Sequence, residues 1–208
     1  MMKKLIFTIL FIALLSPLFA QDSHDLVNIL TLDSTIVIDI RYATANNFMG
    51  DTLYSANICL LRKGVAERLV KVHRDLKKMG LGLKIWDGYR PLSVQKKMWE
   101  KMPNSSYVAN PAYGSNHNRG AAVDVTLVDS LGNELPMPTA FDDFSEKAGS
   151  NYQALPKELI ENRRLLQGAM VKHGFSVIKS EWWHFNDKNI KSYPVIDIPL
   201  EQFADKKK

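Results

Sequence analysis

Residues 115–128, SNHNRGAAVDVTLV, join a polar loop to an apolar segment, and the rest of the chain is best interpreted outward from them. The second half, residues 121–128, is rich in β-branched residues and predicts a strand. The Asn and Gly residues before it disfavour a helix. We therefore expect His117 on a loop and Asp124 at the start of the strand, with Gly120 allowing the backbone to turn between them.

The segments on either side predict one α+β domain. Short β-branched or aromatic runs typical of strands occupy residues 35–42, 83–86, 175–178 and 182–185. Apolar residues spaced by three and four predict helices over 65–79 and from Pro156 to Gly174, and Ser93 is expected to cap another helix. Because the helices and strands do not alternate regularly, we expect a mainly antiparallel central sheet flanked by helices, with the chemistry on the sheet.

Composition limits the classes of site that the chain can build. The 208 residues are 46% hydrophobic and 24% charged, as in an ordinary globular domain. Cys59 is the only cysteine, which excludes an intramolecular disulfide, a four-cysteine zinc finger and an iron–sulfur cluster. Any metal must be held by His, Asp or Glu. The formal charge of +5 is not arranged as a basic stripe with aromatic residues, so we expect no nucleic-acid partner.

The first twenty residues resemble an export signal. Lys3 and Lys4 precede an apolar run at 5–15, and a small residue follows at Ala20, which predicts a secretory signal peptide over 1–20. An uncleaved signal anchor is the alternative, although the run is shorter than the roughly 20 residues of a membrane span. The remaining domain comprises residues 21–208, with a core at about 25–198. We expect it to be exported to the periplasm and to contain no further membrane-spanning segment.

Two of the five histidines have a carboxylate at a short spacing. His117 precedes Asp124, and Glu181 precedes His184 by three residues in the aromatic segment EWWHF. The pattern suits a metal site in which histidines bind the ion and a glutamate moves protons. The alternatives are a locally capping Asp124 in a buried strand and a Trp-rich core strand with an incidental Glu181. The other histidines, at positions 24, 73 and 173, are interpreted as surface or helix-end residues.

Together these residues supply two imidazoles, one ligating carboxylate and a further acid. Such a set suits a hydrolytic zinc ion, and it could also hold Fe(II). The nearby acid and the aromatic surroundings favour hydrolysis. Arg90, in the turn WDGYRP at 86–91, could hold a substrate carboxylate or stabilise an oxyanion, and the alternative is a structural pair with Asp87.

The motifs resemble those of one family. The pattern S-x-H-x-x-G-x-A-x-D occurs at 115–124 and E-x-W-H at 181–184, with further similarity at 39–50 and 86–91. The chain is therefore similar to the D-alanyl-D-alanine dipeptidases of the VanX type. The resemblance implies one Zn²⁺ ion per chain, with the following roles: metal ligands His117, Asp124 and His184; general base Glu181; oxyanion stabiliser Arg90; substrate-binding residue Ser115.

A further match concerns substrate choice. The segment MPTAFD at 137–142 contains the family's Phe-Asp pair, which implies that Asp142 holds the free ammonium of a dipeptide. A turn role, or Asp143 in its place, is the alternative. The implied function is hydrolysis of D-Ala-D-Ala to two D-alanines, for cell-wall peptide turnover or scavenging. The nearer alternative is a periplasmic D,D-carboxypeptidase or endopeptidase acting on longer muropeptides, and the more distant one is a noncatalytic zinc-stabilised binding module.

Overall fold

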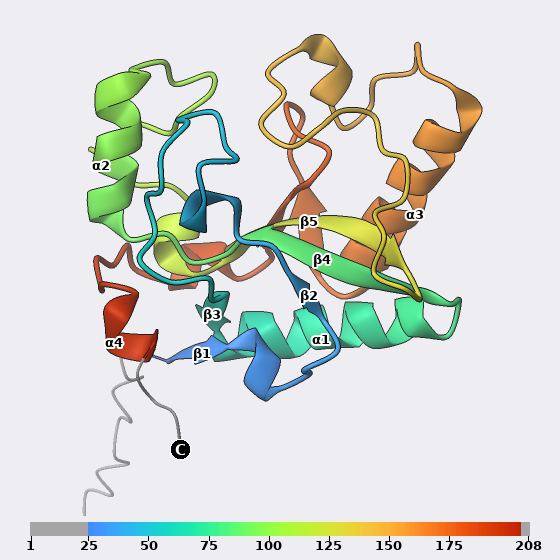
Figure 1. Ribbon diagram of the computed structural model, residues 1–208, viewed down its shortest axis with the longest axis horizontal. Helices are drawn as coiled ribbons and strands as arrows, with labels where there is room; N and C mark the ends of the chain where they lie inside the picture. Colours follow the sequence, from blue (N-terminus) through green and yellow to red (C-terminus); the bar gives the residue numbers. More distant parts are fainter. Residues whose placement is uncertain (1–24, 205–208) are drawn as a thin grey trace, which may run out of the picture.

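A five-stranded sheet runs through the middle of the computed structural model, which describes residues 25–204 (Figure 1). Its strand order is β2-β4-β5-β7-β6; β2 and β4 are parallel, and the other neighbouring pairs are antiparallel. The expected α+β domain with a mainly antiparallel sheet is thus confirmed. The strands of this sheet are β2 (Val37–Ile38), β4 (Leu81–Asp87), β5 (Ala122–Asp129), β6 (Phe175–Val177) and β7 (His184–Asp187).

A small second sheet and the helices complete the fold. The small sheet pairs β1 (Leu26–Asn28) with β3 (Leu60–Arg62) in antiparallel register. The α-helices are α1 (Lys63–Lys77), α2 (Leu92–Lys101), α3 (Lys157–Lys172) and α4 (Glu201–Ala204). Single 3₁₀ turns are η1 (Ile29–Thr31), η2 (Arg41–Ala43), η3 (His117–Arg119), η4 (Glu146–Ala148) and η5 (Ile190–Ser192). Within the described part of the chain, every helix is too short or too polar to cross a membrane.

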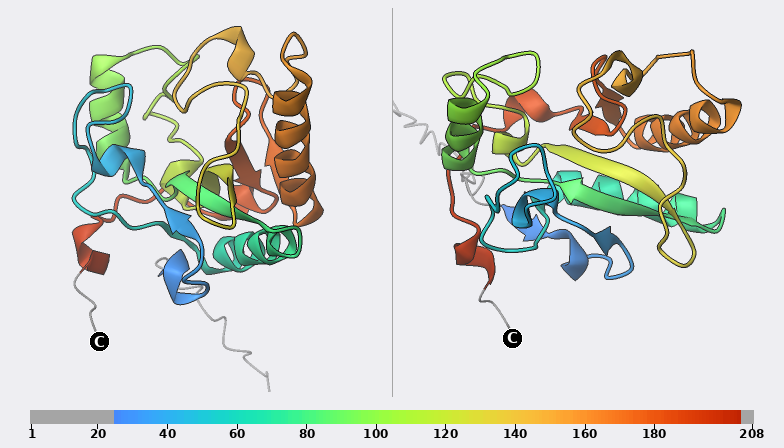
Figure 2. Two further views of the ribbon diagram at one scale, coloured as in Figure 1. Left: turned by 45° about the vertical axis from the view of Figure 1, so that its right-hand side comes forward. Right: turned by 45° about the horizontal axis from the view of Figure 1, so that its top comes forward.

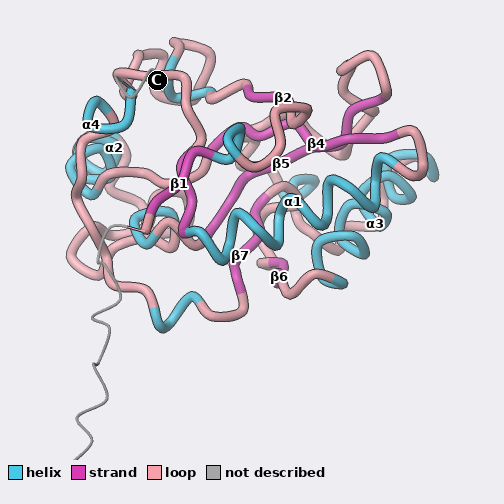
Figure 3. Tube along the Cα trace, turned by 90° about the horizontal axis from the view of Figure 1, so that it is seen from below, coloured by secondary structure: helices cyan, strands magenta, loops and turns pink. Residues whose placement is uncertain are grey.

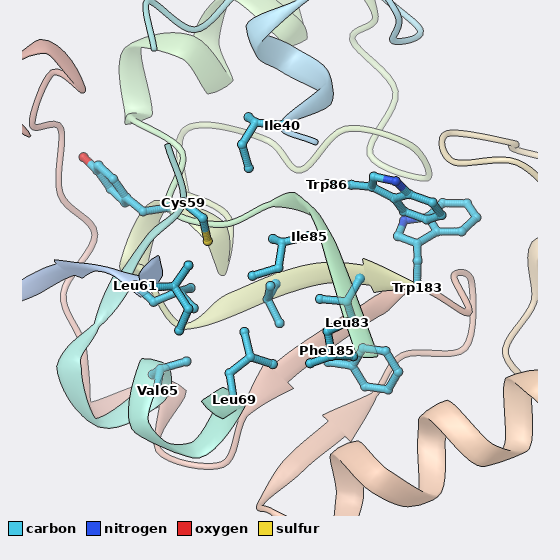
Figure 4. Close-up of a cluster of buried hydrophobic side chains, with 14 of the residues drawn as sticks. Ile40, Cys59, Leu61, Val65, Leu69, Leu83, Ile85, Trp86, Trp183 and Phe185 are labelled. Carbon is cyan, nitrogen blue, oxygen red and sulfur yellow. The ribbon is translucent and has the colours of Figure 1, made fainter. Parts of the chain in front are cut away.

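Helix α1 covers one face of the sheet (Figures 2 and 3). Its apolar stripe, including Val65 and Leu69, is fully buried. Because side chains alternate along a strand, Leu83 and Ile85 of β4 point toward α1, whereas Trp86 points to the opposite face (Figure 4). This aliphatic layer between α1 and the sheet is the main core, and it holds the strands in a fixed register.

The register places polar side chains on the sheet face opposite α1. Val123, Val125 and Leu127 of β5 alternate with Asp124, so Asp124 faces away from the helix. His184 of β7 is the direct partner of Asp124 across the two strands. Two candidate site residues are therefore brought together by strand pairing alone, near one end of the sheet.

Several predicted elements differ from those observed. Only Val37–Ile38 of the expected 35–42 strand pairs with β4, because the side chain of Asp33 accepts hydrogen bonds from both the amide and the hydroxyl of Thr35 and holds a turn there. Downstream, η2 turns the chain and buries Tyr42. The last strand begins at His184 rather than Trp182, although the Trp183 carbonyl still accepts from the Val125 amide (3.0 Å).

The prediction that Ser93 caps α2 is wrong. The helix begins at Leu92 after Pro91, with no side-chain cap of its own. Instead, Asp197 accepts a hydrogen bond from the Ser93 amide (2.8 Å). The packed core also extends beyond residue 198, since Leu200 is buried in it.

His73 is another correction, because it is buried rather than at the surface. It lies on the same stripe of α1 as Leu69 and Leu76, at helical spacing. Its Nδ1 accepts a hydrogen bond from the Leu83 amide (3.1 Å), and its Nε2 lies 3.0 Å from the Thr35 hydroxyl. By contrast, His173 does end α3, as expected. The predicted signal peptide and His24 lie outside the described residues.

Candidate metal centre

Three side chains from three elements converge on one point. His117 lies on η3, Asp124 on β5 and His184 on β7. His117 Nε2 lies 3.1 Å from His184 Nδ1, and Asp124 Oδ1 lies 3.0 Å from His184 Nδ1 and 3.4 Å from His117 Nε2. All three residues are buried. The spacing is that of a group able to share one metal ion, with one donor atom from each residue.

Gly120 brings His117 close to the strand. It ends η3 with φ of +66°, a left-handed conformation that favours glycine. A Cβ at this position would lie 2.7 Å from the side chain of Leu26. Both observations agree with the turn expected here, and they explain how residues so near in sequence can face one another.

Hydrogen bonds on the outer side of each imidazole test whether the cluster fits a metal. His117 Nδ1 lies 2.8 Å from the Gly88 carbonyl oxygen, and His184 Nε2 lies 2.9 Å from the side-chain oxygen of Asn186. Since an oxygen acceptor requires an N–H, the neutral form of each ring presents its other nitrogen as a lone pair to the centre. Two lone pairs and a carboxylate at this spacing repel one another unless a cation lies between them, so the donor set fits a divalent metal.

The charges in the cluster also favour a cation. Burial raises the pKa of the Asp124 carboxyl. The charges of His117 and His184 and their hydrogen bonds to Asp124 more than offset this and hold that pKa well below its usual range. Burial lowers the pKa of His184, but the hydrogen bond and charge of Asp124 more than offset this and raise it to about 9. The free cluster therefore draws positive charge to the same point that a metal ion would occupy.

Glu181 lies beside the three residues without joining them. Its Oε2 is 3.8 Å from His184 Nδ1, and its side chain is 24% exposed and lines the cavity. Burial raises the pKa of its carboxyl, and the charge of Asp124 adds to the effect, although the neighbouring histidines oppose it. A carboxyl whose pKa is raised in this way is better suited to accept and return a proton than an ordinary exposed carboxyl.

Arg90 lines the same cavity and is also paired with Asp87. Its Nη2 and Nε donate to Asp87 Oδ2 (2.6 and 3.1 Å), and its Nη1 donates to Gln95 (2.9 Å). The guanidinium carbon also lies 5.0 Å from the ring centre of Tyr42. The structural pair with Asp87 is thus present, and two of the five N–H groups of the guanidinium have no hydrogen-bond partner within the described residues, which leaves them available to a ligand.

Asp142 lies across the cavity in a strained backbone conformation. It is the one described non-glycine residue with positive φ (+59°). Tyr42 donates its hydroxyl to the carboxylate (3.1 Å to Oδ1), and the Phe48 amide donates to Oδ2 at 3.4 Å. Burial and the charge of Asp124 raise the pKa of Asp142 to about 7. A strained, partly buried acid facing a cavity is typical of a binding residue rather than of a surface turn.

The cavity between these residues has a volume of about 250 Å³. Aromatic rings from three loops meet along its wall: Phe144 lies 4.6 Å from Tyr107 and 5.5 Å from Phe48, between ring centres. Ser115 also lines the cavity, and its hydroxyl accepts a hydrogen bond from the Asn118 amide (3.3 Å). All seven site residues named from the sequence therefore lie in or beside one cavity.

Four supporting residues were not identified from the sequence. Tyr42 binds Asp142, Gly88 and Asn186 bind the two histidines, and Asn118 ties the His117 loop to the Arg90 carbonyl (2.8 Å). Tyr42 and Gly88 fall within motifs that were noted, at 39–50 and 86–91. Asn186 had one available signal, since its position two residues after His184 on a strand places it on the same face.

Comparison with known proteins agrees with this geometry. Residues 22–201 match the Peptidase_M15 family model, which is described as D-ala-D-ala dipeptidase. A D-alanyl-D-alanine dipeptidase of Escherichia coli (strain K12) is 37% identical over 184 residues, which cover 88% of this chain and 94% of the relative. Another from Enterococcus faecium is 32% identical, over 78% of this chain and 92% of the relative.

Among solved structures, the similarities are distant. The D,D-dipeptidase VanXYg in complex with a D-Ala-D-Ala phosphinate analog has a TM-score of 0.40 and 19% identity, over 62% of this chain and 51% of that chain. The LdcB LD-carboxypeptidase has a TM-score of 0.46 and 21% identity, over 89% of this chain and 79% of that chain. With scores this low, the assignment of function depends on the sequence relatives and on the geometry of the site.

Proposed function

The chain belongs to the Peptidase_M15 family of D-Ala-D-Ala dipeptidases and is a metallopeptidase, and we propose that it hydrolyses the dipeptide D-Ala-D-Ala to two D-alanines with one zinc ion per chain. The observation that carries this proposal is the meeting of a three-residue metal site with Glu181, Arg90 and Asp142 around one cavity. In this scheme His117, Asp124 and His184 hold the zinc. A zinc ion in such a site lowers the pKa of water and polarises a carbonyl.

Asp142 and Arg90 orient the substrate. The carboxylate of Asp142 pairs with the free ammonium of the dipeptide, and the Tyr42 hydroxyl keeps that carboxylate aimed at the cavity. The two free N–H groups of Arg90 donate to the carbonyl oxygen of the scissile amide as negative charge develops on it. Because Asp87 and Gln95 already fix the guanidinium, little reorganisation is needed when that charge appears.

Glu181 moves the proton. Its carboxylate takes a proton from the attacking water, whose oxygen bonds to the carbonyl carbon, and the same group later gives the proton to the departing amine as the C–N bond breaks. The raised pKa of Glu181 suits both halves of this transfer. The two products are free D-alanines, and the enzyme returns to its starting protonation state.

The partly buried carboxylate of Asp142 supports a dipeptide rather than a longer peptide as substrate. An N-blocked peptide would bring no positive charge to this carboxylate and would leave it desolvated and unpaired. Such a mismatch costs about 2 kcal/mol or more, which corresponds to about a 30-fold difference in kcat/KM.

The test compares free D-Ala-D-Ala with its N-acetyl derivative on the zinc-loaded protein, by release of D-alanine. We expect hydrolysis of the free dipeptide and at least about a 30-fold lower kcat/KM for the blocked one. Equal or preferred cleavage of the N-acetyl compound would instead assign the protein to the D,D-carboxypeptidases. Bound zinc without hydrolysis of either compound would indicate a noncatalytic binding module.

We also propose that the protein is exported to the periplasm, where it would meet cell-wall fragments. The proposal is supported by Lys3, Lys4 and the apolar run at 5–15, followed by Ala20. Intact-mass measurement of protein from a periplasmic extract is expected to give a chain that begins at residue 21. Recovery from the cytoplasm with Met1 retained would contradict this.

A further inference from the structure

We propose that Asn186 is a positioning residue for the metal site, that it fixes the tautomer of His184, and that Asn116 in turn fixes the Asn186 amide. The inference rests on the metal centre proposed above. It concerns two asparagines that do not themselves belong to the set of ligands. Their effect is on which nitrogen of His184 carries a proton, and so on which nitrogen can bind the ion.

The strand brings Asn186 to His184. Both residues lie on β7 two positions apart, so their side chains share a face of the sheet. Pairing with β5 sets His184 opposite Asp124 and Asn186 opposite Ala122, one step further from the cluster. With only a methyl group at Ala122, the Asn186 side chain has space to lie behind the imidazole, where its Oδ1 is 2.9 Å from His184 Nε2.

Asn116 determines which end of the Asn186 amide faces the ring. Its Nδ2 donates to the same Asn186 Oδ1 at 2.9 Å, so one oxygen accepts from two donors. Turning the Asn186 amide alone would direct its NH₂ group at the Asn116 NH₂ group, without an acceptor between them. With the Asn116 amide oriented as in the structure, Asn116 therefore favours the arrangement in which Asn186 accepts and His184 Nε2 donates.

In the neutral form of His184, this arrangement leaves Nδ1 free for a metal. The opposite tautomer would place a proton on Nδ1, between His184 and the Asp124 oxygen 3.0 Å away, and that proton would have to leave before an ion could bind. His117 is fixed in the same sense by a backbone carbonyl, which no side-chain substitution removes. Asn186 is thus a side chain outside the ligand set through which the metal affinity can be changed.

The experiment measures the zinc dissociation constant by competition with a chelator, and activity is not needed for the result. Asn186→Leu removes the acceptor at similar size and is expected to weaken zinc binding about 10- to 100-fold. Asn186→Asp keeps an oxygen acceptor and is expected to bind zinc within about threefold of the wild type. Asn116→Leu, which frees the amide to turn, is expected to have an intermediate affinity. Asn189→Leu changes an exposed asparagine nearby and serves as the matched control.

A second readout separates this role from a merely structural one. In metal-free protein labelled with ¹⁵N-histidine, at a pH above the pKa of His184, the wild type is expected to show the His184 proton on Nε2, and Asn186→Leu is expected to show a larger share of the Nδ1-protonated form. If the wild type and Asn186→Leu bind zinc tightly with equal dissociation constants, the inference is overturned and the proposed function stands. Equal weakening by Asn186→Leu and Asn186→Asp would also overturn it. A wild type that binds no zinc would overturn both.

Discussion

Replacing Glu181 with glutamine separates proton transfer from metal binding. Within the described residues, no hydrogen bond holds its carboxylate, and its nearest charged partner is His184 Nδ1 at 3.8 Å. The Glu181→Gln change would therefore leave no neighbouring donor without a partner, and we expect the free energy of unfolding to stay within about 0.5 kcal/mol of the wild type. Zinc content is expected to stay at one ion per chain, since the three ligands are untouched.

Turnover is expected to fall steeply in the same variant. A positioned general acid–base contributes about 10²- to 10⁴-fold to a reaction, which corresponds to about 3–5 kcal/mol of activation free energy. The assay follows D-alanine release from D-Ala-D-Ala, with zinc measured on the same sample. Glu146→Gln, an exposed change outside the cavity, is the control and is expected to retain full activity. Normal turnover by Glu181→Gln, or loss of zinc together with activity, would refute the assigned role.

Three further changes have defined outcomes. Asp142→Asn is expected to lower kcat/KM for D-Ala-D-Ala by at least about 30-fold and to narrow its preference over the N-acetyl compound; an unchanged preference would contradict the ammonium contact. Gly88→Ala puts a Cβ 2.8 Å from the Cys59 sulfur and is expected to lower the free energy of unfolding by about 1–3 kcal/mol, measured by denaturant unfolding. It is also expected to weaken zinc binding, because it moves the Gly88 carbonyl that holds His117. Burial lowers the pKa of His73, so below pH 6.5 the unfolded chain binds a proton that the folded protein does not. The free energy of unfolding is therefore expected to fall from pH 7 to pH 5 more steeply in the wild type than in His73→Gln. Parallel plots of unfolding free energy against pH for the two proteins would contradict this.

The spacing of the histidines and carboxylates predicted candidate metal-binding residues, whereas the individual roles, including those of Asp142 and Ser115, came from the resemblance to the family. A histidine, a flexible glycine and an aspartate at the start of a strand need only a turn to face one another, and Gly120 supplies it. The pairing of Asp124 with His184 was not predictable from spacing alone. It depends on the register of β5 and β7, which is fixed by the packing of the opposite face against α1.

The elements that were predicted wrongly depend on contacts between distant segments. The segment 35–42 has the composition of a strand, but its first residues turn around Asp33 and its last residues bend into η2 to carry Tyr42 to the cavity. Capping of α2 by Asp197 spans a separation in sequence that local capping rules do not cover. The burial of His73, by contrast, was visible in its spacing from Leu69, and the neighbouring charges obscured it.

Titration of metal-free protein with zinc tests the central claim most directly, with bound metal and D-Ala-D-Ala hydrolysis followed in the same samples. We predict that both quantities rise together and stop at one zinc ion per chain, and that His117→Ala binds no stoichiometric zinc at the same concentrations. Full hydrolysis by the metal-free protein, or stoichiometric zinc binding by His117→Ala, would contradict the account.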